Sequence, residues 1–187
     1  FEAAHACIFR WLAEGRITGL RIDHPDGLAD PAQYFDRLQR RYAALARAAG
    51  REPTALYLVV EKILADHEPL PADWPVHGAT GYRFSSLVNG LFVDTASQAA
   101  FDDAYTSFTG DTKDFEEAVY ECKKHIIETS LYSDLGWLAD TLYRIAQADR
   151  RTFDFTRNQL RIALTEVAAV FPVYRTYLVP DGTPPSD

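Results

Sequence analysis

The feature that most constrains this chain is a ten-residue stretch, residues 19–28, with the sequence GLRIDHPDGL. Its first part is apolar enough for a buried strand over 20–22, and it runs directly into two carboxylates, a histidine, a proline and a glycine. A carboxylate held near a core needs a partner or shifts its pKa, so stability alone does not favour this cluster. In parallel α/β sheets and barrels, reactive side chains sit at the carboxyl ends of strands. The stretch therefore predicts a strand that ends in a functional site.

An ordinary turn is the alternative explanation for part of this stretch. Residues 25–27, Pro-Asp-Gly, are typical of a turn that follows a strand. A turn does not account for Arg21 and Asp23, which are two residues apart and so point to the same face of a strand. For that reason we favour the functional interpretation.

The elements around the stretch follow the order of βαβ units. A helix is expected over 2–14, before the strand. A second helix is expected to begin at Pro31, with Asp30 as its N-cap. The apolar run 56–60 is then expected to form a buried parallel strand that ends in Glu61. Alternating helices and strands predict an α/β fold with a parallel sheet.

The pattern changes after the second strand. Residues 66–85 are rich in Pro, Gly, His and aromatic residues and are expected to form a long functional loop. From 97 to 171 the apolar residues recur at helical spacing, which predicts a helical subdomain. Residues 173–179 are expected to form one more strand. The expected domains are central βα units of the barrel over 1–65, an active-site loop region over 66–96, the helical subdomain over 97–171, and a return to a barrel strand with a tail over 172–187.

Composition and charge limit the possible partners. The chain has 187 residues and a net charge of −8, which argues against nucleic acids and anionic membranes because both need a basic surface. Cys7 and Cys122 show no metal or redox spacing, so we expect them to be reduced and buried in a cytoplasmic protein. No apolar run is long enough to cross a membrane. The chain begins at Phe1 inside an expected helix, which suggests a piece of a longer polypeptide.

Each of the two predicted strands ends in a carboxylate, the first in Asp23 and the second in Glu61. Neighbouring strands lie about 5 Å apart, so both groups are expected to face one pocket. Carboxyl groups about 5–5.5 Å apart are typical of retaining glycoside chemistry. Arg21 would keep Asp23 ionised, and burial would raise the pKa of Glu61, as suits a general acid/base. A structural Arg–Asp pair beside an unrelated Glu remains the alternative at this point.

Four segments resemble one enzyme family. Residues 19–28 resemble the nucleophile-bearing strand of the α-amylase superfamily and, through HPDGL, its maltooligosyltrehalose synthase branch. Residues 58–64, LVVEKIL, resemble the acid/base motif of that branch. Residues 74–82, WPVHGATGY, and 171–177, FPVYRTY, also resemble segments of it. The four matches occur in the family's order and cover nearly the whole chain.

The resemblance implies part of a (β/α)8 TIM barrel with a mostly helical insertion subdomain. The implied activity is an isomerase reaction of trehalose biosynthesis without a cofactor or metal. It converts the reducing-end α-1,4 linkage of a maltooligosaccharide into an α,α-1,1 linkage by intramolecular transglycosylation. Asp23 would be the nucleophile, Glu61 the acid/base, and Arg21 the residue that orients the nucleophile. The implied substrate contacts are His24, Lys62, His77 and Tyr82.

Two features of the family have no match in the chain. These are a third catalytic Asp on a later strand and an earlier strand motif that ends in Asn-His. The chain is therefore expected to be an internal fragment whose partner is the remainder of the parent barrel. Two other functions stay open: an amylase-type retaining hydrolase of α-1,4-glucans that uses Asp23 and Glu61, and a non-catalytic helical interaction module in which the carboxylates cap helices.

Overall fold

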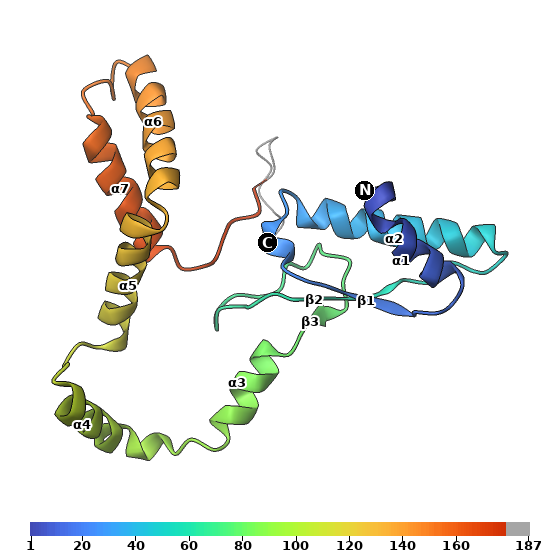
Figure 1. The fold of residues 1–187 in the computed structure, drawn as a ribbon, viewed down its shortest axis with the longest axis horizontal. Coiled ribbons are helices and arrows are strands. Elements are labelled where there is room, and N and C mark those ends of the chain that lie inside the picture. The colour runs from blue at the N-terminus through green and yellow to red at the C-terminus, as the bar shows by residue number, and fades with distance from the viewer. Residues whose placement is uncertain (179–187) are drawn as a thin grey trace. The chain divides into compact units, whose positions relative to one another are not determined.

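The computed structural model describes residues 1–178, which divide into two compact units (Figure 1). The first unit contains Phe1–Asp94 and the segment that begins at Arg175, and the second contains Thr95–Tyr174. The first unit consists of α1 (Glu2–Ala13), β1 (Gly19–Ile22), the 3-10 helix η1 (Pro25–Gly27), α2 (Pro31–Ala48), β2 (Tyr57–Val60), β3 (Gly78–Ala79) and α3 (Tyr82–Gly90).

A small parallel sheet organises the first unit. Its strands are in the order β1-β2-β3, and both neighbouring pairs are parallel. Ile22 is opposite Val60 in the register, so β1 and β2 end at the same edge. The sequence prediction of a parallel βαβ unit is confirmed. The described residues show a mostly helical chain with this sheet, and they do not contain a complete barrel.

The two faces of the sheet have different surroundings. Leu58 and Val60 are fully buried in a core that also contains side chains of α1 and α2, and Leu20 and Ile22 pack against it. Successive side chains of a strand point to opposite faces. Arg21, the residue between Leu20 and Ile22, therefore points away from α1 and α2. Glu61, which continues β2, follows the same alternation.

The caps of α2 show why this helix begins where the sequence predicts. The Asp30 carboxylate accepts a hydrogen bond from the backbone N–H of Gln33, and Pro31 occupies the first turn. At the other end Gly50 has a positive φ of 68°, which favours glycine. The predicted first helix is also present as α1.

The loop expected over 66–85 is shorter than predicted. Residues 78–79 form β3 through hydrogen bonds to β2, and α3 begins at Tyr82. A strand of two residues has too little alternation to be recognised from its sequence. Gly81, with φ 61°, separates this strand from the helix.

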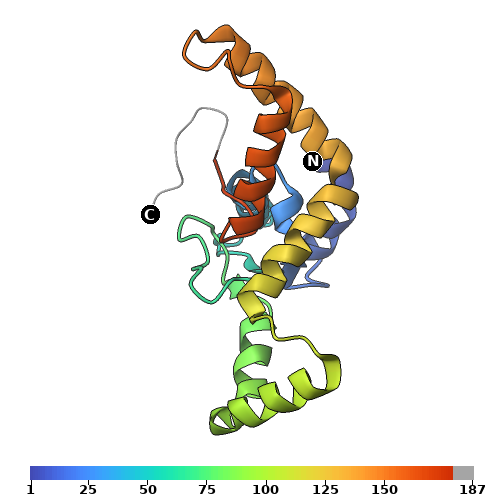
Figure 2. The ribbon, with the colours of Figure 1, turned by 90° about the vertical axis from the view of Figure 1, so that its left-hand side faces the viewer.

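The second unit is helical throughout its regular structure (Figure 2). Its elements are the 3-10 helix η2 (Thr95–Ser97), α4 (Gln98–Thr109), α5 (Phe115–Thr129), α6 (Tyr132–Ala148) and α7 (Arg157–Val170). A small core contains Ile127, Leu135 and Ala169. The helices that the periodicity of 97–171 predicts are therefore present in the structure.

Two other sequence expectations are wrong. The part of the expected strand 173–179 that the structure describes, 173–178, contains no strand, and the remainder of it, like the expected tail, lies outside the described residues. Cys7 and Cys122 are free thiols, as expected, but both are exposed, because each is on a helix face turned away from the core. Within residues 1–178, none of the helices is long and apolar enough to span a membrane.

Candidate active site

The adjoining ends of β1 and β2 bring Asp23 and Glu61 to one place. The backbone N–H of Glu61 donates a hydrogen bond to the carbonyl oxygen of Ile22 at 2.8 Å, so the parallel ladder continues up to the two carboxylates. Asp23 directly follows the last residue of β1, and Glu61 directly follows the last residue of β2. The strand register therefore produces a carboxylate pair from residues far apart in the sequence.

Arg21 connects the two carboxylates. Its Nη1 donates to Asp23 Oδ1 at 2.8 Å, and its Nη2 is 3.9 Å from Glu61 Oε1. The hydrogen bond from Arg21 to Asp23 raises the pKa of the guanidinium, which therefore stays charged. A fixed cation between two carboxylates orients both and reduces their mutual repulsion.

Glu61 has two hydrogen-bond donors of its own. The Tyr82 hydroxyl donates to Oε1 at 2.6 Å, and the backbone N–H of His24 donates to Oε2 at 3.0 Å. These two bonds, with the charge of Arg21, lower the pKa of Glu61 below its ordinary value, although burial acts in the opposite direction. The expectation that burial raises the pKa of Glu61 is therefore wrong, because donors that stabilise the carboxylate outweigh desolvation.

His24 reaches Glu61 through its backbone, which has a left-handed conformation with φ 42° and ψ 56°. This conformation is uncommon outside glycine and is found repeatedly at functional sites. The His24 ring lies over Gly27, where an added Cβ would come within 2.8 Å of ring carbon Cδ2. A side chain at position 27 would therefore require the exposed imidazole of His24 to move.

The end of β3 places Tyr82 against Glu61. The backbone N–H of Thr80 donates to the carbonyl oxygen of Val60 at 2.8 Å, so residue 80 is fixed to the end of β2. Two residues later α3 begins with Tyr82, whose pKa is raised by the hydrogen bond to Glu61. Tyr82 therefore lies at the predicted site. The sequence analysis expected it to contact the substrate, and the structure shows that it contacts the Glu61 carboxylate.

Lys62 and His77 lie elsewhere. The Lys62 side chain is 0% exposed and is paired with Asp26 and Glu68, so its ammonium has no surface that a sugar can contact. Alternation explains this, because the residue after Glu61 turns to the other face of the sheet. His77 precedes β3 and accepts a hydrogen bond from the backbone N–H of Leu58 through Nδ1. The structure thus separates both residues from the carboxylate pair.

A group of residues without an assigned role in the sequence analysis lies next to this site. Asp26 accepts hydrogen bonds from Lys62 and from the Tyr177 hydroxyl. Arg175 donates to the carbonyl oxygens of Asp26 and Leu28 at 3.0 and 2.5 Å. The sequence could have pointed to these residues, because residue 26 lies in the motif 19–28 and residues 175 and 177 lie in the motif 171–177.

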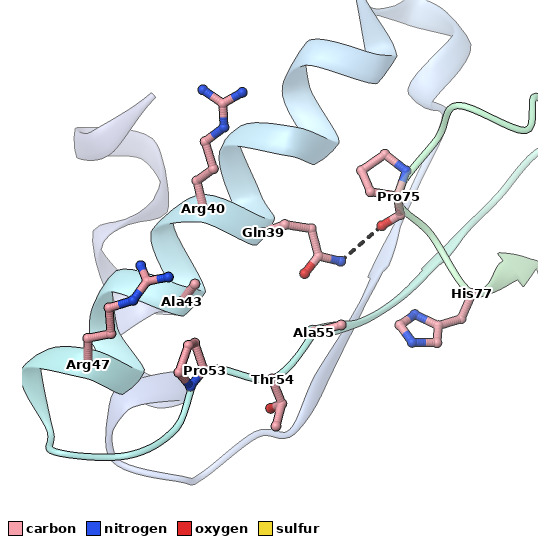
Figure 3. Close-up of a pocket in the computed structure, with 9 residues that line it drawn as sticks. All are labelled: Gln39, Arg40, Ala43, Arg47, Pro53, Thr54, Ala55, Pro75 and His77. Carbon is pink, nitrogen blue, oxygen red and sulfur yellow. Dashed lines mark hydrogen bonds between the residues drawn. The ribbon is translucent and has the colours of Figure 1, made fainter.

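A separate concavity of about 490 Å³ lies where β2 begins, at the edge opposite the carboxylates (Figure 3). Gln39 lines this concavity, and its side-chain amide donates to the carbonyl oxygens of Leu56 and Pro75 at 3.0 and 2.9 Å. His77 lines the same concavity. These contacts attach α2 to the starts of β2 and β3.

No family model matches the chain. A protein of Mycobacterium tuberculosis, assigned as a maltooligosyl trehalose synthase in strains CDC 1551 and H37Rv, is 34% identical over 149 residues. These residues are 80% of this chain and 18% of the relative. Over this segment the chain is homologous to the maltooligosyltrehalose synthases.

Solved structures of maltooligosyltrehalose synthases agree with this relationship. The enzyme from Arthrobacter ramosus is 34% identical, with a TM-score of 0.74, over 95% of this chain and 21% of that chain. The DSM5389 glycosyltrehalose synthase is 29% identical, with a TM-score of 0.73, over 97% of this chain and 22% of that one. The chain therefore spans about a fifth of the length of each of these two proteins.

The described residues also lack the grouping of side chains that a metal site requires. Within residues 1–178, the structure contains no group of three or more His, Cys, Asp or Glu side chains placed to hold a metal ion. The carboxylates at the strand ends are instead partnered by a guanidinium, a phenol and a backbone amide.

Proposed function

We propose that this chain carries two catalytic carboxylates of a maltooligosyltrehalose synthase, with Asp23 as the nucleophile and Glu61 as the acid/base. The observation that supports this most is the pair itself: the two groups adjoin at the carboxyl ends of neighbouring parallel strands and share Arg21. The position agrees with the general location of reactive groups in parallel α/β folds. Arg21 then orients the nucleophile through its hydrogen bond to Asp23.

The proposed reaction is the conversion of a reducing-end α-1,4 linkage of a maltooligosaccharide into an α,α-1,1 linkage. Because the product keeps the α configuration, two displacements are needed. In the first, the Asp23 carboxylate attacks the anomeric carbon while Glu61 gives its proton to the departing O4 of the terminal glucose. In the second, the anomeric hydroxyl of that glucose attacks the glycosyl-Asp23 ester, and Glu61 accepts its proton.

The environment of Glu61 has a consequence for this mechanism. Hydrogen bonds from Tyr82 and His24 favour its carboxylate, which is the form that accepts a proton in the second displacement. The first displacement needs the protonated form, so one of these bonds has to weaken when substrate binds. Tyr82 is the more movable partner because it donates through a side chain, and its hydroxyl would then be available to a sugar. His24, whose side chain is exposed, is a second proposed substrate contact.

We further propose that the chain is part of a (β/α)8 barrel and that the second unit is its helical insertion. The faces of the sheet support this, since the helices cover one face and the carboxylates point to the other, as they do inside a barrel. The remainder of such a barrel would supply the third carboxylate and the missing strands. The free thiols of Cys7 and Cys122 support a cytoplasmic location, where thiols stay reduced.

Product analysis of the full-length protein that contains this chain tests the proposed activity. Incubation with maltopentaose is expected to give a non-reducing pentasaccharide with a terminal trehalose unit. Release of shorter reducing sugars as the main products would instead show an amylase-type hydrolase, and absence of any conversion would favour a non-catalytic module.

A trapping experiment tests the roles of the two carboxylates. Glu61→Gln is expected to be severely impaired on maltooligosaccharides but to form a covalent adduct from an α-maltosyl fluoride, whose leaving group needs no protonation. Mass spectrometry of the digested variant should find the glycosyl group on Asp23. An adduct on any other residue contradicts the assignment.

A further inference from the structure

Behind the carboxylate pair is a second group of charged and polar residues, the Lys62 cluster, which consists of Lys62, Asp26, Glu68 and Tyr177. Lys62 Nζ donates to Asp26 Oδ2 at 3.3 Å and to Glu68 Oε1 at 2.8 Å. The Tyr177 hydroxyl donates to the other oxygen of Asp26. The backbone N–H of Ala65 donates to the second oxygen of Glu68 at 3.2 Å.

The Lys62 cluster is buried. The side chain of Lys62 is 0% exposed, that of Asp26 is 9% exposed and that of Glu68 is 10% exposed. Burial by itself lowers the pKa of Lys62, but its hydrogen bonds with Glu68 and Tyr177 outweigh this effect and raise it, so the ammonium stays charged. Burial and the bond to Asp26 raise the pKa of Tyr177 to about 12, so the phenol stays protonated.

Stability alone is a weak reason for such a cluster. Desolvating buried ion pairs costs about as much as their attraction returns, and well-packed apolar residues often serve a fold equally well. What an ion cluster provides is a defined geometry, because each partner has to be met at hydrogen-bonding distance. The position of the cluster in the fold therefore indicates which geometry is being held.

The Lys62 cluster joins three segments at the catalytic edge. Asp26 is in η1, which directly follows Asp23 and His24. Lys62 follows Glu61 directly after the end of β2. Tyr177 comes from the C-terminal segment, where its ring meets Trp74 of the core edge-on at 5.1 Å.

The same contacts are made to η1, the short helix whose N-cap is His24. His24 is the N-cap of η1, and its left-handed backbone directs its N–H to Glu61 Oε2. A conformation of this kind persists only when its surroundings hold it in place. Lys62 holds η1 from one side through Asp26, and Arg175 holds it from another through the carbonyl oxygens of Asp26 and Leu28.

From this geometry we propose that Lys62 is a positioning residue of the carboxylate site. Its ion pair with Asp26 fixes η1, so that the His24 amide stays on Glu61 and Asp23 keeps its distance from Glu61. Lys62 therefore acts through the backbone of η1 and does not contact the substrate. This inference rests on the proposed function, since it assigns Lys62 to the same site.

The test uses Lys62→Met in the full-length protein, with maltopentaose as substrate. The variant keeps an unbranched side chain of nearly the same length and removes the ammonium group. We expect kcat to fall at least about 10-fold with KM nearly unchanged, since small misplacements of reacting groups lower the rate of the chemical step. We also expect the alkaline limb of the pH profile of kcat/KM to move to higher pH, because Glu61 loses the His24 N–H and its pKa rises.

Two further variants make the result specific. Lys124→Met removes the same charge from an ion pair with Glu166 in the second unit, at 2.6 Å, and should leave kcat and the pH profile unchanged. Tyr177→Phe keeps the ring on Trp74 and removes the hydroxyl that bonds Asp26 and interacts with Lys62. It should show the same changes as Lys62→Met, to a smaller degree, in a folded protein.

The outcomes separate this inference from the proposed function. Wild-type kcat and an unchanged pH profile in Lys62→Met, with an active wild type, would overturn the positioning role alone. An inactive wild type would overturn the proposed function, and this inference with it. If Lys62→Met fails to fold, Tyr177→Phe decides, and unfolding of both variants would show a purely structural cluster and reject the proposal.

Discussion

At the scale of single residues, the site depends on which groups contact Glu61. Tyr82 and the His24 amide occupy one oxygen each, and Arg21 lies near the first of them while it binds Asp23 directly. Asp23 is 75% exposed, whereas Glu61 is 18% exposed. The two carboxylates therefore have different surroundings, as expected when one attacks a sugar and the other exchanges protons.

Asp23→Asn is expected to remove turnover while leaving substrate binding largely intact. The amide cannot form the glycosyl ester, and this interaction acts mainly in the transition state. We expect a loss in kcat of at least about 1,000-fold. Steady-state kinetics and calorimetric titration with maltopentaose measure the two effects. Asp36→Asn, an exposed carboxylate of α2 paired with Arg40, is the control. A fully active Asp23→Asn enzyme would contradict the role of nucleophile.

Tyr82→Phe is expected to change the pH dependence of the reaction. The Tyr82 hydroxyl stabilises the Glu61 carboxylate and so lowers its pKa. Without that bond the pKa of Glu61 rises, and the protonated form persists to higher pH. The alkaline limb of kcat/KM should therefore move to higher pH. Tyr57→Phe, at an exposed tyrosine of β2, should leave the limb in place. A shift in the opposite direction would show that Tyr82 does not stabilise the carboxylate.

At the scale of elements, α2 connects the core to the site. Phe35 and Leu38 are fully buried beneath the sheet, while Gln39 bonds the backbone at Leu56 and Pro75. The helix thereby fixes the start of β2, whose other end carries Glu61. Its N-terminus depends on a single side-chain cap, Asp30.

Removing this cap is expected to destabilise the first unit by about 1 kcal/mol. Asp30→Ala deletes the acceptor for the backbone N–H of Gln33, which lies at 2.9 Å. Asp36→Ala in the same helix removes only an exposed pair with Arg40 and should cost about 0.5 kcal/mol or less. Urea denaturation of both variants measures the difference. Equal stabilities for the two would mean that the cap contributes no more to α2 than the exposed ion pair does.

At the scale of the whole molecule, the two units differ in how much they bury. Among the described residues, the core of the first unit contains eight buried side chains, and the core cluster of the second contains Ile127, Leu135 and Ala169. The helix α4 contributes no buried residue. The free energy of local opening falls where few apolar contacts hold a segment.

Amide hydrogen exchange of the 187-residue chain should show this difference. Amides of β2 and α2 are expected to exchange most slowly, those of α6 and α7 at intermediate rates, and those of α4 fastest. Mass spectrometry of peptic fragments provides the measurement. Protection of α4 equal to that of α2 would contradict the expected order.

The sequence by itself determined the parallel βαβ unit, the start of α2 and the places of Asp23 and Glu61. These features depend on local patterns: an apolar run, an Asp-Pro cap and charges at strand ends. The helical pattern of 97–171 is of the same kind. Each pattern can be recognised within a short window of neighbouring residues, although the pairing of β1 with β2 itself joins distant residues such as Ile22 and Val60.

The tertiary structure decided what surrounds those carboxylates. Glu61 has a lowered pKa because Tyr82 and the His24 amide reach it from two other segments. Lys62 is buried and paired with Asp26. Asp26 in turn is bonded by Tyr177, which is 151 residues further along the chain. Hydrogen bonds and desolvation depend on distances between segments far apart in the chain, and only the folded arrangement sets those distances.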